Sequence, residues 1–375
     1  MFEFDQPVQK AVLGFLLAAV IVYLLTPMMS RLAHRVGVVD TPTDDRRMHL
    51  FATPLLGGMA IYAGFVVATL VLVRPIDRTT QGILIGGTII TLVGLIDDLF
   101  DIRPLLKFFG QLVAIGVAVW FDMRITRLTL PFTRELVNLP GWLSIIFTVV
   151  WAATIINMVN FIDGLDGLAA GVCAISALTF SVIALSMDRG SMGLVAAILG
   201  GATFAFLRFN FYPASIFMGD AGSMLLGFVL SVMSVQSMMK NAATVALVLP
   251  LLVLGVPFVD LFLIVWRRWR KGVPFYTSGQ DHVHHDLVLV VGFSERKSVL
   301  LLYGWCLTLN GLAIAMRLQS RIAIIILACG AVIATGYMAQ LLGRYRNDPS
   351  RTVEEVAEAA LAASDDLSKT EGQSE

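Results

Sequence analysis

Long apolar stretches alternate with short polar segments along most of the chain. A helix needs about 20 apolar residues to cross the hydrocarbon core of a bilayer, and eleven stretches reach or approach that length. The sequence therefore predicts an all-α integral membrane protein with about 11 transmembrane helices. The predicted spans are residues 11–29, 55–73, 81–96, 105–121, 142–159, 167–187, 191–209, 221–238, 243–266, 298–316 and 322–342.

The charges between these spans predict the topology. Eleven spans place the two ends of the chain on opposite sides of the membrane, and most Lys and Arg residues follow odd-numbered spans. Because positively charged loops stay in the cytoplasm, we expect the N-terminus outside and the C-terminus inside. Residues 1–345 are expected to form a single polytopic membrane domain. We expect the acidic residues 346–375 to form a cytoplasmic tail, disordered or loosely helical, and the outer loop 122–141 to form a short hairpin.

The composition agrees with a membrane protein and excludes several other classes. Apolar residues make up 57% of the chain and charged residues 14%, against about 25% charged residues in a soluble domain. This balance excludes a disordered chain, and three widely spaced cysteines exclude a disulfide-stapled module. The 27 basic and 27 acidic residues leave no net charge, so no nucleic-acid partner is expected.

Acidic residues gather at the predicted cytoplasmic ends of four spans. A carboxylate is costly inside a bilayer, and any one of these residues has a simpler explanation as a helix cap. Together they would repel one another unless a cation lay among them, and hard oxygen ligands suit Mg²⁺ bound with a substrate phosphate. The sequence therefore predicts a Mg²⁺ site, with Mn²⁺ as a substitute, beside a phosphate. The acidic residues are Asp97, Asp98, Asp101, Asp163, Asp166, Asp220 and Asp260.

Two polar segments refine this expectation. After the fifth span, two amides and two carboxylates are spaced to face one ligand, which suits a ribose or the edge of a nucleobase; they are Asn157, Asn160, Asp163 and Asp166. The alternative is a glycine-based C-cap, with Asp166 capping the next helix. Farther along, Asn210 begins a segment in which Gly219 and Gly222 flank Asp220. Glycine lets backbone approach a ligand closely, so Asp220 is a candidate metal ligand.

Histidines and basic residues supply candidate phosphate donors. Three of the five histidines lie within four residues, at His282, His284 and His285. Zinc is an alternative, but no cysteine or further histidine provides a clear closing ligand. Imidazoles with pKa values near neutrality favour donation to a diphosphate. The basic run at 267–271 is interpreted as a topology determinant, and Arg46, Arg47 and His49 in the first inner loop are a second set of phosphate donors.

In this order the motifs resemble a known family, the polyprenyl-phosphate N-acetylhexosamine-1-phosphate transferases. The resemblance spans nearly the whole chain. Leu105 and Gln280 stand where the family commonly has basic residues, which leaves Lys107 after the paired aspartates. The motifs are Gly37-Val-Val-Asp40-Thr-Pro42, Asp97-Asp98, Asn160-Phe-Ile-Asp163-Gly-Leu-Asp166-Gly, Phe217-Met-Gly-Asp220-Ala-Gly-Ser, Pro257-Phe-Val-Asp260 and His282-Val-His-His285.

The resemblance implies an activity and a set of roles. It implies Mg²⁺-dependent transfer of GlcNAc-1-phosphate from UDP-GlcNAc to undecaprenyl phosphate in the bacterial inner membrane, with inhibition by tunicamycin. This step would initiate a lipid-linked cell-surface polysaccharide such as O-antigen. The implied catalytic residues are Asp97, Asp98, Lys107, His282, His284 and His285. The implied substrate-binding residues are Arg47, His49, Asn157, Asn160, Asp163, Asp166, Asn210 and Asp260. The implied metal ligands are Asp97, Asp98 and Asp220.

Several alternatives stay open at this stage. Transfer by direct attack of the lipid phosphate, with one of Asp97 and Asp98 accepting a proton, competes with a route through an aspartyl-phosphate. The donor is UDP-GlcNAc or another UDP-N-acetylhexosamine. A cation-coupled transporter is a remote alternative, because transporter sites lie near the membrane midplane whereas these acids gather at one face. Partners besides the substrates are membrane lipid and, as a candidate assembly, a second copy of the chain.

Overall fold

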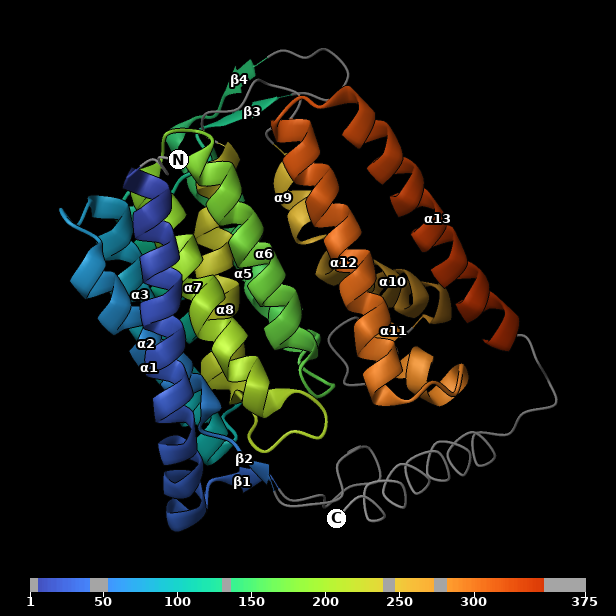
Figure 1. The fold of residues 1–375 in the computed structure, drawn as a ribbon, viewed down its shortest axis with the longest axis horizontal. Helices are drawn as coiled ribbons and strands as arrows, with labels where there is room; N and C mark the ends of the chain where they lie inside the picture. The colour runs from blue at the N-terminus through green and yellow to red at the C-terminus, as the bar shows by residue number, and fades with distance from the viewer. Residues whose placement is uncertain (1–5, 41–52, 130–135, 239–246, 273–281, 347–375) are drawn as a thin grey trace, which may run out of the picture.

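The computed structural model describes residues 6–40, 53–129, 136–238, 247–272 and 282–346, and these are mostly helical (Figure 1). Two short antiparallel strand pairs lie at opposite ends of the molecule. The helices are α1 (Gln6–Val36), α2 (Gly57–Leu72), α3 (Arg78–Phe100), α4 (Pro104–Trp120), α5 (Gly141–Phe161), α6 (Leu168–Leu185), α7 (Gly190–Asn210), α8 (Gly219–Met238), α9 (Val248–Val253), α10 (Gly255–Lys271), α11 (Val283–His285), α12 (Glu295–Arg317) and α13 (Arg321–Arg346). The strands are β1 (Val39–Asp40), β2 (Thr53–Pro54), β3 (Arg127–Thr129) and β4 (Leu136–Asn138), and a π-helical segment, η1 (Asp286–Val290), follows α11.

The helices confirm an all-α integral membrane protein that crosses the membrane several times. Within the described ranges, eight helices are long and apolar enough to span a bilayer, and α2 and α4 are shorter apolar helices. The expected number of eleven spans is not confirmed. The eight are α1, α3, α5, α6, α7, α8, α12 and α13.

The predicted ninth span differs most from expectation, because it is broken in two. Helix α9 ends at Val253, and the chain changes direction before α10 (Figure 1). A proline at position 257 has no N–H for the Val253 carbonyl, and its ring conflicts with that carbonyl in a continuous helix. The freed carbonyl instead accepts hydrogen bonds from the Ser176 hydroxyl (2.9 Å) and the Asn310 amide (3.1 Å). The break is thus stabilised by α6 and α12.

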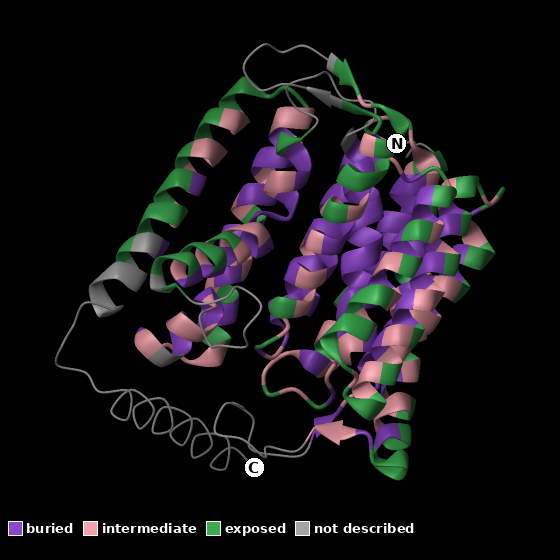
Figure 2. Cartoon of the chain, turned by 180° about the vertical axis from the view of Figure 1, so that it is seen from behind, coloured by how far each residue is buried: buried purple, intermediate pink, exposed green. Residues whose placement is uncertain are grey.

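Helix α8 forms the centre of the bundle. In its membrane-spanning part 89% of residues are buried, against 22% in α1 and 11% in α13. Burial is concentrated in the middle of the bundle, and α13 lies exposed at its edge (Figure 2). Small residues allow the close helix contacts expected in a membrane: a methyl group at Gly58 would lie 2.2 Å from the backbone nitrogen of Gly222. The start of α8 is therefore held against α2.

The strand pairs mark the two ends of the bundle. Strands β3 and β4 pair with Arg127 opposite Asn138, which confirms the hairpin expected within residues 122–141. Strands β1 and β2 pair at the opposite end, where α3 finishes and α8 begins (Figure 1). The predicted tail, 346–375, lies almost entirely outside the described residues, so its conformation stays a prediction.

Candidate active site

A close approach between α3 and α8 brings two acidic segments together. A methyl group at Gly94 would lie 2.5 Å from backbone atoms of Asp220 and Ala221. At this contact the Asp98 carboxylate accepts hydrogen bonds from the backbone N–H groups of Asp220 (2.7 Å) and Ala221 (3.1 Å). N–H groups in the first turn of a helix have no partner within the helix. Asp98 thus caps α8 and fixes the backbone of Asp220.

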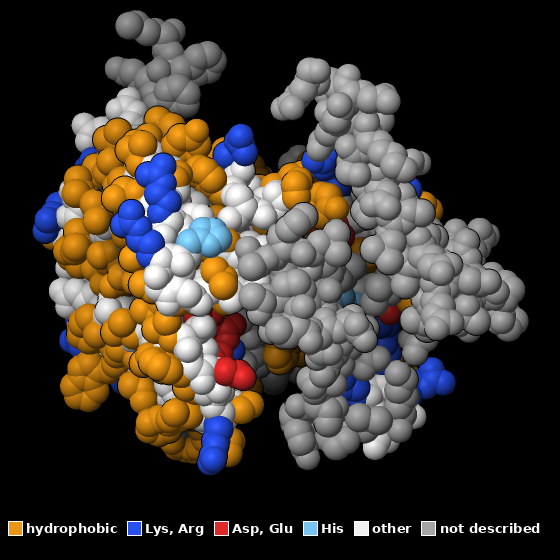
Figure 3. All heavy atoms as spheres, turned by 90° about the horizontal axis from the view of Figure 1, so that it is seen from below, with side chains coloured by type: hydrophobic (Ala, Val, Ile, Leu, Met, Phe, Trp, Pro, Cys, Tyr) orange, Lys and Arg blue, Asp and Glu red, His pale blue; other side chains and the backbone are white. Residues whose placement is uncertain are grey.

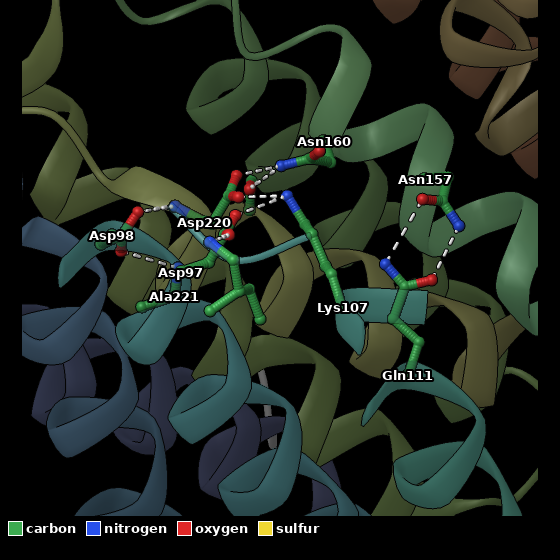
Figure 4. Close-up of polar contacts among 10 residues, drawn as sticks. Asp97, Asp98, Lys107, Gln111, Asn157, Asn160, Asp220 and Ala221 are labelled. Atoms are coloured by element: carbon green, nitrogen blue, oxygen red, sulfur yellow. Dashed lines mark hydrogen bonds and ion pairs between the residues drawn. The ribbon is translucent and has the colours of Figure 1, made fainter. Parts of the chain in front are cut away.

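The Asp220 side chain meets polar groups from three other helices. The Lys107 ammonium, on α4, contacts the Asp220 carboxylate and lies 3.0 Å from Oδ2 of Asp97 on α3. Asn160, at the end of α5, donates to Asp220 and to the Ser223 hydroxyl (2.9 Å). Figure 4 shows these side chains pointing toward one another. Their carboxylates and ammonium are 12% to 23% exposed, so the cluster is accessible but mostly shielded from water.

The donor set of this cluster fits a divalent cation. Two carboxylates in close proximity disfavour each other's charge unless a positive charge lies nearby. In this structure the Lys107 ammonium supplies that charge between Asp97 and Asp220. Carboxylate oxygens with open positions are also the ligands that Mg²⁺ prefers. Asp97 and Asp220 are therefore suited to a divalent cation once the lysine moves aside. Acidic side chains are visible at this end of the molecule, beside hydrophobic surface (Figure 3).

The turn between α5 and α6 carries two more acids. Loss of solvent around Asp163, and then the charges of Asp220, Asp98 and Asp166, raises the pKa of Asp163 to about 8. The Asp166 carboxylate accepts a hydrogen bond from the backbone N–H of Ala214 (2.8 Å) in the loop between α7 and α8. Asp166 therefore ties that loop to the turn, whereas the N-cap of α6 is Gly167.

Two amides predicted to bind substrate are engaged within the protein. Asn157 donates to Oε1 of Gln111 (2.8 Å) and accepts from Nε2 of Gln111 (3.3 Å), so the two amides form a reciprocal pair (Figure 4). Asn210 is buried and donates to the carbonyl of Ile216 (3.0 Å). In this structure Asn157 therefore links α5 to α4, and Asn210 holds the loop that leads into α8.

Asp260 joins α10 to the histidine segment. Its Oδ2 lies 2.8 Å from Nδ1 of His282, and its Oδ1 accepts a hydrogen bond from the backbone N–H of Val283 (2.7 Å). The carboxylate is buried, with 5% of the side chain exposed, and the His282 ring is 14% exposed. Asp260 thus orients the first histidine and the start of α11.

The other two histidines pack behind His282, with ring centroids 4.4 Å apart. Burial lowers the pKa of His284 well below its usual value and that of His285 to about 4, and in each case neighbouring histidines contribute. The expectation of imidazoles that titrate near neutrality is therefore wrong for these two, which are neutral at pH 7. His284 also packs against Gly164, so it supports the turn that carries Asp163. Nearby, Arg267 pairs with Asp286 at 2.6 Å, so this part of the basic run has a structural contact.

Sequence comparison identifies the family. The model of Glycosyl transferase family 4 matches residues 80–238, which include all but the first two residues of α3, the helices α4 to α8 and the cluster of Asp97, Lys107, Asn160 and Asp220. The chain is 34% identical over 299 residues to the Bacillus subtilis (strain 168) "Probable undecaprenyl-phosphate N-acetylglucosaminyl 1-phosphate transferase", covering 80% of this chain and 83% of that protein. This chain belongs to the polyprenyl-phosphate N-acetylglucosamine-1-phosphate transferase family.

Relatives within this transferase family differ in their named lipid. A Mycobacterium leprae (strain TN) "Decaprenyl-phosphate N-acetylglucosaminephosphotransferase" is 35% identical over 328 residues, covering 80% of this chain and 82% of the relative. The Yersinia pestis "Undecaprenyl-phosphate alpha-N-acetylglucosaminyl 1-phosphate transferase" is 30% identical over 278 residues, covering 72% of this chain and 75% of that relative. Membership makes the chain a membrane-bound phosphosugar transferase and places the acidic cluster inside the matched region.

The structure adds residues to the candidate site of this transferase and leaves some predicted ones untested. Gln111 and Ser223 were missed by sequence reasoning. Gln111 follows Lys107 by four residues, which places both on one face of α4, and Ser223 lies within one turn of Asp220. Arg47 and His49, like Gln280, fall outside the described residues, so their expected roles stay predictions.

Proposed function

We propose that this transferase moves GlcNAc-1-phosphate from UDP-GlcNAc to undecaprenyl phosphate and releases UMP. The observation that carries the proposal is the convergence of Asp97, Lys107, Asn160 and Asp220 from four helices at one end of the bundle. The Lys- and Arg-rich loops predicted at this end support a cytoplasmic location for it. The product would initiate a lipid-linked cell-surface polysaccharide, such as O-antigen, at the bacterial inner membrane.

We propose that Asp97 and Asp220 hold Mg²⁺, with Mn²⁺ as a substitute. When bound, the ion supplies charge neutralisation on the diphosphate of the donor. Both oxygens of Asp98 already accept backbone hydrogen bonds, so Asp98 positions Asp220 instead of binding the ion directly. The resemblance implies three metal ligands, Asp97, Asp98 and Asp220, and this division of roles leaves Asp97 and Asp220 as the proposed ones.

Lys107 is the proposed donor to the phosphates. In this structure its ammonium neutralises Asp97 and Asp220, and it would donate to the donor diphosphate if Mg²⁺ were held by these two carboxylates. A positioned cation that stabilises developing charge in a transition state typically contributes a factor of about 10²–10³ in rate. His282 is held by Asp260 through Nδ1. His284 and His285 support the segment from behind.

We propose direct attack of the lipid phosphate on the sugar-linked phosphorus of UDP-GlcNAc. A bond forms between a lipid-phosphate oxygen and that phosphorus, while its bond to the bridging oxygen breaks and UMP departs. A phosphate monoester with a second pKa near 6 is largely dianionic at pH 7, so little help from a base is needed. Trapping a phosphorylated enzyme with labelled donor in the absence of lipid would instead support the aspartyl-phosphate route.

The nucleotide and sugar are proposed to lie beside the turn between α5 and α6. Asn160 donates to Asp220, Asp163 is near enough to feel the charge of Asp220, and Asp166 fixes the neighbouring loop through Ala214. Arg47 and His49 are proposed to add phosphate contacts from the first inner loop. The same arrangement accommodates another UDP-N-acetylhexosamine, which is the alternative donor.

A pair of aspartate substitutions tests the proposal. Asp220→Asn removes a negative charge from the cluster. The control is Asp101→Asn, which changes an exposed aspartate at the end of α3. Asp101 has φ of 47°, a backbone conformation that asparagine also adopts. We expect Asp220→Asn to abolish UMP release while its size-exclusion profile stays native, and Asp101→Asn to retain near wild-type activity. Equal activity of the two variants would remove Asp220 as a metal ligand.

A further inference from the structure

A second group of ligand-type side chains lies apart from the Asp97–Asp220 cluster. Asp260 on α10 and two residues of the histidine segment, His282 and His284, each place one ligand atom within 4.8 Å of the others. Asp260 and His284 are buried, with 4% and 2% of their surface exposed. The Asp260 carboxylate supplies the additional metal ligand that the histidine motif does not contain.

The surroundings of His284 indicate that this group is incomplete as it stands. Nε2 of His284 is buried and has no hydrogen-bond partner among the described residues, and the same holds for Nδ1 of His285. Buried polar atoms nearly always have a partner, so each exception needs an explanation. A small cavity with room for a water-sized occupant is lined by Asp260 and His284, with Ile162 and Trp305 among the apolar residues.

We infer that Asp260, His282 and His284 form a binding site for a divalent transition metal of the Zn²⁺ class. Imidazole nitrogens with one carboxylate suit zinc and its neighbours, whereas Mg²⁺ prefers oxygen ligands and retains water. Oδ2 of Asp260 and Nδ1 of His282 are 2.8 Å apart. Ligands of a tetrahedral zinc with bonds of about 2.1 Å lie roughly 3.4 Å apart, so binding requires this pair to open by about 0.6 Å.

The metal has a structural role. It joins α10 to the histidine segment, and His284 packs on Gly164 in the turn between Asp163 and Asp166. A bound ion therefore fixes that turn through His284. Three protein ligands leave one position of a tetrahedral ion for water. The site is separate from the proposed Mg²⁺ site and does not depend on the proposed transfer reaction.

Metal titration of the purified full chain, with any affinity tag removed, tests this inference. We expect the wild-type protein in detergent to retain one equivalent of Zn²⁺ after desalting, measured by mass spectrometry of the metal. Co²⁺ in its place should give visible absorption bands typical of tetrahedral coordination. Asp260→Asn and His282→Gln should each weaken Zn²⁺ binding by more than about tenfold, because loss of even an outer-shell partner weakens metal binding by about 10–100-fold.

Two control variants make the outcome specific. Asp220→Asn, in the acidic cluster, and His34→Gln, at an exposed position near the end of α1, should bind Zn²⁺ as the wild type does. His282 is partly exposed, so its variant is at low risk of misfolding, and the size-exclusion profile checks this. Absence of Zn²⁺ from the wild type, or equal binding by the ligand variants, would overturn the inference. Because the titration needs neither donor nor lipid, its failure is distinct from failure of the proposed transferase activity.

Discussion

Lys107 gives the most informative test of how the acidic cluster works. In this structure its ammonium contacts the carboxylates of both Asp97 and Asp220. A divalent ion that binds the same carboxylates must displace it. Lys107→Met removes the charge but keeps most of the side-chain length. A change in Mg²⁺ affinity can therefore be assigned to loss of the ammonium and not to loss of packing.

The expected size of this competition follows from the two contacts. A pair of unit charges at about 4 Å contributes about 1 kcal/mol in water and more where water is partly excluded. Displacing the ammonium from two carboxylates therefore costs at least about 2 kcal/mol. Since 1.36 kcal/mol corresponds to a factor of ten, removing the lysine should improve Mg²⁺ affinity by about thirtyfold. The maximal rate should fall by about 10²–10³, because the donor to the diphosphate is lost.

The assay is UMP release by nanodisc-embedded protein over a series of Mg²⁺ concentrations. We expect Lys107→Met to reach its half-maximal rate at a lower Mg²⁺ concentration than the wild type, with a reduced plateau. Arg78→Gln, which removes an exposed cation at the other end of α3, is the control and should change neither value. An unchanged or increased Mg²⁺ requirement in Lys107→Met would refute the idea that the ammonium and the ion compete.

Three further substitutions test other parts of the account. Asp98→Asn should lower the unfolding free energy by about 1 kcal/mol, because an amide cannot accept both backbone hydrogen bonds at the start of α8; an unchanged melting temperature would contradict this. Gly94→Ala should destabilise the protein by about 1–3 kcal/mol and reduce turnover, since its methyl group meets backbone of α8 at 2.5 Å. Gly87→Ala on the same helix is the control, because its nearest neighbour is a leucine methyl at 3.4 Å, and equal melting of the two variants would count against the argument. The pKa of Asp163 is raised to about 8 in the folded protein, above its value of about 4 when unfolded, so wild-type stability should fall as pH rises between these values. Asp163→Asn should show a smaller loss in melting temperature from pH 5 to pH 8.5, and parallel profiles would show that Asp163 is not responsible.

The apolar pattern predicts most helices because each span requires a long stretch without charge. It does not reveal the break in the ninth predicted span, since Val253, Leu254 and Gly255 are as apolar as a continuous helix requires. The break follows from Pro257 and from the partners that Ser176 and Asn310 offer to the freed carbonyl. Those partners come from distant helices, which local sequence does not place.

The gathering of aspartates at one end is predictable, but the role of each one is not. Asp97 and Asp98 are adjacent in sequence, yet one faces Lys107 and the other caps α8. That distinction depends on the close contact that Gly94 permits. The link from Asp260 to His282 likewise depends on the fold, because 22 residues separate them in the chain.

The most direct test of the central claim is UMP release by the purified protein given undecaprenyl phosphate and UDP-GlcNAc, with Mg²⁺ or with EDTA. The account predicts UMP and a lipid-diphospho-GlcNAc product in equal amounts with Mg²⁺, and neither with EDTA. Release of UMP only from another UDP-N-acetylhexosamine would contradict the proposed donor. If folded protein released no UMP from any donor, the transferase activity itself would be contradicted.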